Sequence, residues 1–179
     1  VLKVPFGVNY LWDPTASVAI GAATGASFVR EIFTGVFASD MGVWAPDCAT
    51  PVRMRRRLGR RDMKLFFNIN AEFAASLDHR PIELRARSAV FSSLADAVLV
   101  SGPLTGQPAE ASDLRKVAEA VEGTPVFANT GVNINNVGDV MAVASGCVIG
   151  THFKKDGNTW NQVDPDRVRR FMDAVDKLR

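Results

Sequence analysis

The sequence has 179 residues, of which 47% are hydrophobic and 22% are charged, as in an ordinary soluble globular protein. That length supports one domain, residues 1–179, with a sizeable core. The net charge of +2 gives no argument for a nucleic-acid or membrane-surface partner, and no apolar run approaches the length of a membrane span.

In chain order, apolar segments rich in β-branched residues predict six buried strands, at Pro5–Tyr10, Ser27–Ile32, Lys64–Ile69, Ala97–Ser101, Pro125–Thr130 and Cys147–Thr151. A helical pattern follows each strand. The predicted helices run from Pro14 to Thr24, from a cap at Thr50 to Gly59, from Pro81 to Leu94, from Ser112 to Gly123, from a cap at Asn133 to Val143, and from Asp164 to Val175.

Strands buried on both faces and alternating with helices predict a parallel sheet, either an open doubly wound sheet or a closed barrel. The open sheet usually carries a glycine-rich turn after its first strand, and the segment Phe6-Gly7-Val8-Asn9-Tyr10 has none. A complete eight-unit barrel needs about 250 residues. The sequence therefore predicts an α/β fold, a TIM-type parallel β/α barrel with six of its eight units in this chain, and we expect two further units before Val1.

Motifs along the whole chain resemble those of one family. They are Pro5-Phe6-Gly7-Val8-Asn9, Ala22-Ala23-Thr24-Gly25-Ala26, Phe28-Val29-Arg30, Arg55-Arg56-Arg57-Leu58-Gly59, Ala95-Asp96-Ala97-Val98, Ser101-Gly102, Thr105-Gly106, Thr130-Gly131-Val132, Gly150-Thr151, Lys154-Lys155-Asp156-Gly157 and Val163-Asp164-Pro165-Asp166-Arg167-Val168. As a set they resemble the BtpA/SgcQ family of barrel proteins, which is related to the ribulose-phosphate-binding barrels. The resemblance places Phe6 at the start of the third barrel strand.

The resemblance implies either a cofactor-free sugar-pathway protein or, in photosynthetic cells, a factor for photosystem I assembly. One segment departs from the family. Where relatives usually carry Asp, His and Lys at alternate positions, this chain has Asn68, Asn70 and Glu72, and the usual second His is Phe73. An acid, base or cation that this segment supplies in relatives is therefore changed here.

Polar residues gather where the predicted strands end, which is the functional face of a parallel barrel. The candidate substrate-binding residues are Asn9, Arg30, Ser101, Asn129 and Thr130, and the candidate catalytic residues are Glu31, Asn68 and Asn70. Neutral amides offer both donors and acceptors, which favours a polar, sugar-like ligand. The alternatives are that these side chains satisfy strand ends, and that Arg30 and Glu31 form a structural ion pair.

Two turns after the last two strands predict a phosphate site at Gly131, Gly150 and Thr151. Glycine lets backbone N–H groups approach an anion, the helix expected from Asn133 would add partial positive charge, and barrels often bind phosphate at this position. The alternative is that both glycines only form turns. Further acid/base candidates are Asp40, Glu72, His152 and Lys154, and the scattered carboxylates and histidines predict no metal site.

Two long loops carry aromatic residues. The first, Phe33 to Pro46, contains Phe33, Phe37 and Trp44 and predicts a lid and a subunit contact, or aromatics packed under the loop itself. The second, Asp156 to Val163, contains Trp160 and predicts another contact, so we expect a homo-oligomer.

Two functions fit these patterns. One is an enzyme, an isomerase, lyase or hydrolase without cofactor, acting on a small phosphorylated or sugar-like metabolite. The other is a non-catalytic assembly or regulatory factor. The arginine-rich segment from Arg53 to Arg61 lacks interleaved aromatics and predicts solvated helix surface rather than a nucleic-acid site. Cys48 and Cys147 have no zinc or disulfide spacing, which fits a reduced, cytoplasmic compartment.

Overall fold

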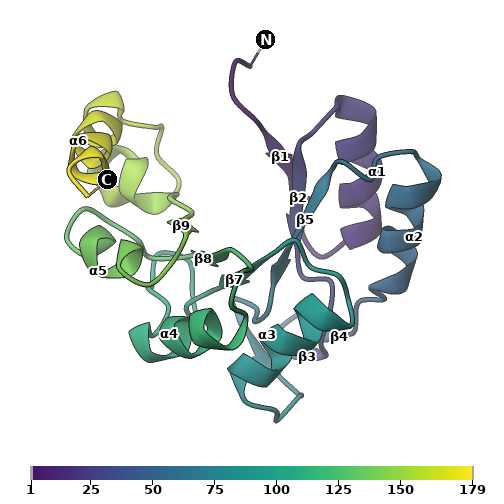
Figure 1. The fold of residues 1–179 in the computed structure, drawn as a ribbon. Helices are drawn as coiled ribbons and strands as arrows, with labels where there is room; N and C mark the ends of the chain where they lie inside the picture. The colour runs from purple at the N-terminus through teal and green to yellow at the C-terminus, as the bar shows by residue number, and fades with distance from the viewer. Residues whose placement is uncertain (1, 179) are drawn as a thin grey trace.

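The main sheet of the computed structural model, which describes residues 2–178, is a curved arc of six parallel strands with helices on its outer side (Figure 1). Its strands lie in the order β1 (Gly7–Val8), β2 (Phe28–Glu31), β5 (Lys64–Asn68), β7 (Ala97–Val100), β8 (Val126–Ala128) and β9 (Gly146–Cys147). Every neighbouring pair is parallel and follows in chain order. The predicted parallel sheet is therefore confirmed, with the curvature of a TIM-type barrel.

The helices are α1 (Pro14–Thr24), α2 (Ala49–Arg57), α3 (Ile82–Phe91), α4 (Ala111–Ala120), α5 (Val137–Met141) and α6 (Pro165–Asp176), with short 3₁₀ turns η1 (Thr151–Phe153) and η2 (Lys155–Gly157). Local chemistry explains where α1 and α6 begin. The Asp13 side chain accepts a hydrogen bond from the Ala16 N–H, and the Asp164 side chain accepts one from the Asp166 N–H. A proline follows each capping aspartate, where its missing N–H costs nothing. None of the helices in residues 2–178 is both long and apolar enough to cross a membrane.

Three predicted boundaries are wrong, and each was displaced by a competing local hydrogen bond or turn. Thr50 does not cap α2, because the Asp47 side chain accepts the Ala49 N–H at 2.9 Å and the helix begins earlier. Asn133 does not cap α5, because its side chain accepts the Asn135 N–H in a turn and α5 starts only at Val137. The last strand, β9, ends at Cys147, and Thr151 begins the 3₁₀ turn η1.

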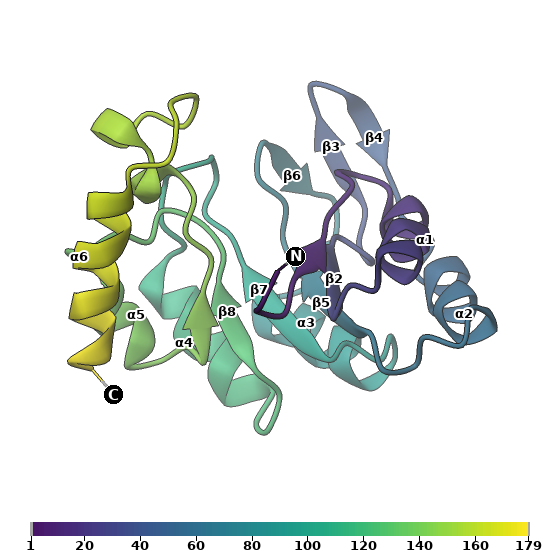
Figure 2. The same ribbon diagram turned by 90° about the horizontal axis from the view of Figure 1, so that it is seen from above.

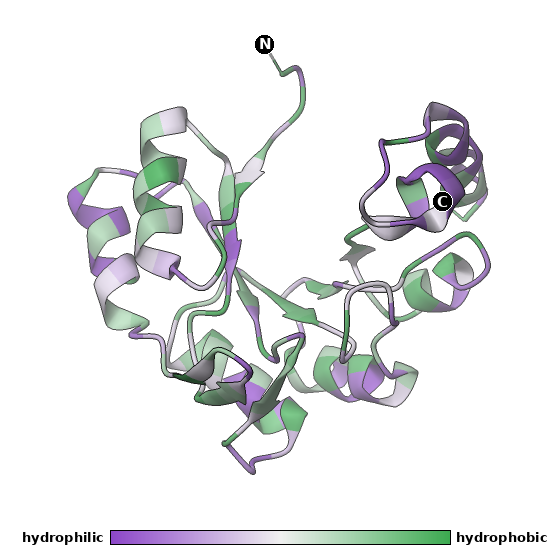
Figure 3. Cartoon of the chain, turned by 180° about the vertical axis from the view of Figure 1, so that it is seen from behind, coloured by the Kyte–Doolittle hydropathy of each residue, from purple (hydrophilic) through white to green (hydrophobic). Residues whose placement is uncertain are grey.

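The core lies between the outer face of the sheet and the helices. Val29, Phe67 and Val98 are fully buried there with Val18 of α1 and Val117 of α4. Figure 3 shows the same division, with apolar strands inside and more polar residues on the outer helix surfaces. Burying this apolar area is the main source of the fold's stability.

A second set of side chains lies on the inner, concave face of the sheet. Phe28, Phe66 and Phe127 stack there, with ring centroids 4.7 Å and 5.4 Å apart. Because successive strand residues alternate between faces, the residue two positions further along each strand faces the same way. Arg30, Asn68 and Asn129 therefore lie just above the aromatic layer, toward the carboxyl ends of the strands.

The arginine-rich segment is more than solvated surface. Arg55 donates to Asp96 at 3.0 Å, and the same carboxylate accepts from Lys64 at 3.1 Å and from the Leu65 N–H at 2.9 Å. Asp96 thus ties α2 to β5 and to the start of β7. Arg60 reaches back to the Ala26 carbonyl at 2.7 Å.

A small antiparallel sheet covers the rim, at the same end of the molecule as η1 (Figure 2). It consists of β3 (Phe37–Ser39), β4 (Gly42–Trp44) and β6 (Ala74–Ser76), in the order β4-β3-β6. The loop predicted to follow β2 is therefore a hairpin that pairs with a segment following β5. Sequence periodicity alone did not reveal these short strands.

The aromatic side chains of the loop from Phe33 to Pro46 pack against the rest of this chain. Phe33 and Phe37 are buried in the cores of this chain, and Trp44 stacks on Trp12 with ring centroids 4.9 Å apart. The prediction that these aromatics lie against another subunit is thereby corrected for Phe33 and Phe37, because the hairpin supplies its own apolar floor. Trp160, on the second loop, is 93% exposed.

Candidate functional site

Two cavities lie at the carboxyl ends of the strands. The first, of about 470 Å³, lies beyond β1, β2 and β5 under the β3–β4 hairpin, and the second, of about 360 Å³, lies beyond β8 and β9. Most of the polar residues singled out in the sequence line one of the two. They therefore form neighbouring parts of one rim, as the barrel architecture predicts.

Arg30 occupies the middle of this rim. Its guanidinium donates to the side-chain oxygen of Asn129 and, at 3.3 Å, to that of Asn9, while the Asn9 amide donates to the Arg30 carbonyl at 2.7 Å. Within residues 2–178 Arg30 and Glu31 do not form an ion pair. The charge of Arg30 is instead held across the inner face of the sheet by two neutral amides.

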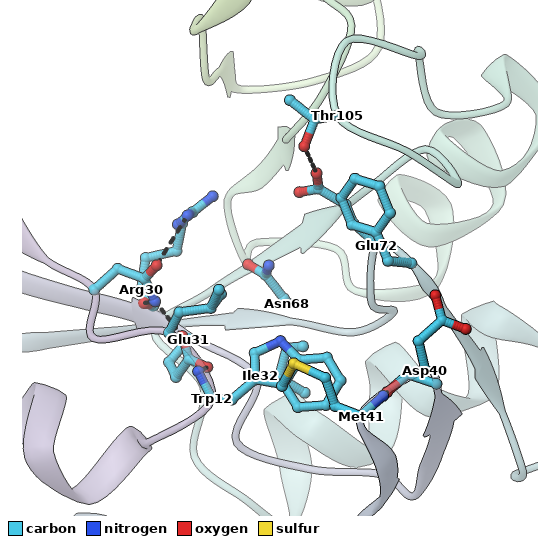
Figure 4. Close-up of a pocket in the computed structure, with 13 residues that line it drawn as sticks. Trp12, Arg30, Glu31, Ile32, Asp40, Met41, Asn68, Glu72 and Thr105 are labelled. Carbon is cyan, nitrogen blue, oxygen red and sulfur yellow. Dashed lines mark hydrogen bonds between the residues drawn. The ribbon is translucent and has the colours of Figure 1, made fainter. Parts of the chain in front are cut away.

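Glu31 is buried at the end of β2, with 2% of its surface exposed. One carboxylate oxygen accepts the Trp12 N–H at 2.8 Å, and the other accepts the Asn9 amide (Figure 4). Burial raises the pKa of the Glu31 carboxyl above its usual value, against the opposing effect of these hydrogen bonds. Glu31 therefore holds a proton more readily than an exposed glutamate, as a general acid or base requires.

Backbone strain accompanies the first cavity. Trp12 and Phe73, both in its wall, have φ angles of +62° and +57°, in the left-handed region that bulky side chains avoid. The Trp12 N–H is held by Glu31, and the Phe73 N–H donates to the Pro103 carbonyl at 2.9 Å. Such residues cost on the order of 1–3 kcal/mol each and concentrate at functional sites.

Asn68 and Asn70 are two positions apart but differ in their bonding. The Asn70 side chain donates to the Ser101 carbonyl at 2.6 Å and accepts the Ser101 N–H at 2.8 Å, so both ends of its amide are used. Asn68 is 9% exposed and lines the first cavity, and within the described part of the chain its side-chain oxygen has no hydrogen-bond partner. Figure 4 shows its amide between Arg30 and Glu72. Asn70 therefore fixes the end of β7, while Asn68 is left free for a ligand.

A polar chain continues from Arg30 toward the second cavity. The Asn129 amide donates to the Ser101 hydroxyl at 2.7 Å, and the Thr130 hydroxyl accepts the Gly102 N–H at 2.6 Å. Four of the five predicted substrate-binding residues, Asn9, Arg30, Asn129 and Ser101, thus belong to one connected network. Thr130 lies beside it and lines the second cavity.

The three predicted phosphate-binding residues line the second cavity together. Gly131 has a φ of +64°, and a Cβ there would lie 2.1 Å from the backbone nitrogen of Pro108. Gly150 has open space beside its Cα, because a Cβ at this position would lie more than 4 Å from every heavy atom of the described residues beyond its two chain neighbours. The Thr151 hydroxyl pairs with that of Thr159 at 2.8 Å. Loop packing alone therefore requires glycine at position 131 but not at position 150.

Sequence reasoning missed Arg167, which reaches the second cavity from the first turn of α6. Its guanidinium donates to the His152 carbonyl at 2.6 Å and lies 3.3 Å from the His152 ring nitrogen Nδ1. Burial and the neighbouring charge of Arg167 lower the pKa of His152, which favours its neutral form. The signals in the sequence were its place in the family motif from Val163 to Val168 and in the first turn of the helix that begins at Asp164-Pro165.

The remaining acid/base candidates divide between the two cavities. Asp40 and Glu72 line the first, and His152 lines the second. Lys154 lines neither and instead forms an isolated β-bridge with Val163. In residues 2–178, no three His, Cys, Asp or Glu side chains lie close enough together to hold a metal ion.

Comparisons with known proteins identify relatives of the whole chain. The sequence model of the BtpA family matches residues 1–177. The chain belongs to the BtpA family. It is 46% identical over 178 residues to the putative sgc region protein SgcQ of Escherichia coli K12, which covers 99% of this chain and 66% of SgcQ. It is 31% identical over 177 residues to the photosystem I biogenesis protein BtpA of Synechocystis, covering 98% and 61% of the two chains. This BtpA-family chain thus spans about two thirds of the length of these relatives.

Solved structures support the fold. A structure described as native KDPGal superposes with a TM-score of 0.59 at 14% identity, over 97% of this chain and 68% of the other. Phosphoribosyl anthranilate isomerase from Thermococcus kodakaraensis gives a TM-score of 0.58 at 16% identity, over 98% and 76%. At such identities the likeness concerns the fold alone. The TIM-type barrel architecture predicted for this BtpA-family chain is confirmed.

Proposed function

We propose that this chain binds a small phosphorylated, sugar-like metabolite across the rim, with the phosphate in the second cavity and the rest of the molecule in the first. The contact between the two cavities carries the proposal. Arg30 of the first cavity donates to Asn129 of the second, and the consecutive residues Thr105 and Gly106 line one cavity each. One ligand can therefore extend from one cavity into the other.

The lining of the second cavity supports phosphate as its occupant. Among residues 2–178, this lining contains the guanidinium of Arg167 and no carboxylate. Arginine is suited to phosphate because its fork of donors stays charged and binds two oxygens at once. The open space at Gly150 leaves room for the anion, and the Thr151 hydroxyl adds a donor.

In this proposal the first cavity holds the reacting end. Glu31 acts as the general acid or base, because its pKa is raised and it lines the cavity. Asn68 accepts a hydrogen bond from the ligand, and Asn70 positions Ser101. Proton transfer of this kind serves an isomerase, lyase or hydrolase and uses no cofactor.

The test is calorimetric titration of the full-length protein with inorganic phosphate and sugar phosphates. Thr151→Glu places a carboxylate in the second cavity and should weaken binding about a hundredfold, since a close like-charge pair costs a few kcal/mol in a partly screened site. Thr159→Glu is the matched control, because it breaks the same hydroxyl pair from a residue that does not line the cavity. Equal affinities in both variants, or no binding to the wild type, would refute the phosphate site.

A second candidate is a non-catalytic assembly factor. One relative is named a photosystem I biogenesis protein, and the β3–β4 hairpin leaves Met41 and Val43 each 72% exposed near the first cavity. Exposed apolar side chains at a rim are typical of protein contacts, including contacts between copies of one chain. Light scattering, and loss of any self-association in a Met41→Ser, Val43→Ser double variant, would support this function. A wild type that binds sugar phosphates as a monomer would argue against it.

A further inference from the structure

The two cavities carry opposite charge. Glu31, Asp40 and Glu72 line the first cavity, and within residues 2–178 none of them forms an ion pair. Of the described residues, the one cation in that lining is Arg30, whose guanidinium is already bonded to two asparagines. In the part of the chain that the structure describes, the lining of the second cavity has Arg167 and no carboxylate. Clustered charges of one sign at a concave site attract ligand groups of the other sign.

The free polar atoms of the first cavity are mostly hydrogen-bond acceptors. One oxygen of Glu72 accepts from the Thr105 hydroxyl at 2.8 Å, which leaves the other oxygen available. The buried side-chain oxygen of Asn68 has no hydrogen-bond partner among residues 2–178. A buried acceptor without a donor is costly, so a ligand that supplies donors gains by filling this space.

The walls add an aromatic surface suited to a cation. Trp12 lines the cavity and is held in place by its stacking on Trp44 and by the Glu31 carboxylate. The face of an indole attracts an ammonium group. The three carboxylates come from separate segments that line a cavity of about 470 Å³, which has room for a small organic cation.

We propose that the first cavity binds a protonated amine, so that the ligand of the rim is a phosphorylated amine with its ammonium at the carboxylates of Asp40 and Glu72. This inference rests on the proposed function and narrows it from sugar phosphates in general to aminated ones. A neutral hydroxyl would satisfy the acceptors but would leave the carboxylate charge without a counterion. An ammonium supplies both the donors and the charge.

The experiment compares matched pairs of probes by calorimetry on the full-length protein. Glucosamine 6-phosphate is compared with glucose 6-phosphate, and 2-aminoethyl phosphate with 2-hydroxyethyl phosphate, with inorganic phosphate and ethanolamine as single-end probes. The aminated member of at least one pair should bind about tenfold tighter or more, as one close charge pair implies. Glu72→Gln keeps an acceptor for Thr105 but removes the charge, so it should reduce that preference. Glu122→Gln removes an exposed carboxylate outside both cavities and should leave the preference unchanged.

The outcomes separate this inference from the function on which it rests. Equal affinity within both pairs, with inorganic phosphate still bound, would overturn the amine and leave the phosphate site standing. The same preference in Glu72→Gln as in the wild type would also overturn it. Binding of ethanolamine without any contribution from phosphate would support the amine and overturn the phosphate site. No binding of any probe would overturn both.

Discussion

Alanine substitutions at Gly131 and Gly150 test why glycine occupies these two positions at the rim. Gly131→Ala adds a Cβ methyl group where φ is +64°, which costs about 1–2 kcal/mol for a residue other than glycine. The new Cβ would also lie 2.1 Å from the Pro108 nitrogen and 2.3 Å from the Gln107 carbonyl carbon. Both are backbone atoms, so the loop must move, and overpacking of this kind costs about 1–3 kcal/mol. The expected loss of unfolding free energy is therefore about 2–5 kcal/mol.

Gly150→Ala is the matched control. Its backbone φ is −120°, and a Cβ there would meet no atom within 4 Å. We expect a clearly smaller loss of unfolding free energy than in Gly131→Ala, because neither a positive φ nor a close backbone contact opposes the new methyl group. The new methyl group would instead enter the second cavity and weaken phosphate binding.

Urea unfolding followed by far-UV circular dichroism measures both variants, with the m value showing whether the two-state treatment holds for each. Calorimetry with phosphate measures the second effect. A Gly131→Ala protein as stable as the wild type, or a Gly150→Ala protein destabilised by the same amount, would refute the reasoning from close contact. Unchanged phosphate affinity in Gly150→Ala would refute the placement of the anion.

Three further predictions concern the core, the ion network and pH. Phe67→Ala should lower the unfolding free energy by about 3–5 kcal/mol, because the ring is fully buried, whereas Met41→Ala at an exposed position should leave the urea midpoint unchanged. Asp96→Ala should cost about 1–3 kcal/mol by leaving three donors without their acceptor, and an unchanged midpoint would contradict its role as a tie between α2, β5 and β7. Because burial raises the pKa of Glu31 in the folded state, wild-type stability should fall as pH rises from the usual glutamate value of 4.5 to the raised one. Glu31→Gln has no carboxyl to titrate and should not show this fall. If the unfolding free energies of the two proteins change in parallel between pH 4 and 8, the raised pKa of Glu31 is excluded as a cause of pH-dependent stability.

Much of the fold could be predicted from local patterns. Five of the six strands lie inside the apolar, β-branched segments that predicted them, because a strand buried on both faces must be apolar along its whole length, while β9 shares only Cys147 with its predicted segment. The starts of α1 and α6 were equally clear, because a capping aspartate followed by proline acts on its immediate neighbours. The family resemblance, carried by motifs along the whole chain, was confirmed by the match over residues 1–177.

Short elements that depend on distant partners could not be predicted in this way. The β3–β4 hairpin exists because β6, from the loop after β5, completes its sheet and because Ile32 and Ala71 form its floor. Strands of three residues have too little periodicity to stand out. The aromatic residues of this loop were visible in the sequence, but only the pairing decided that Phe33 and Phe37 face inward.

The composition of the rim followed from the sequence, since polar residues at strand ends must gather at one end of a parallel barrel. Which of these side chains has a free hydrogen-bonding group for a ligand did not follow from the sequence. Asn68 and Asn70 have the same chemistry and alternate along one segment, yet the end of β7 consumes both hydrogen-bonding groups of Asn70 and leaves the oxygen of Asn68 unpaired. Arg167 reaches the second cavity only because α6 returns to the rim. Hydrogen bonds and charges act between neighbours in space, and those neighbours come from distant parts of the chain.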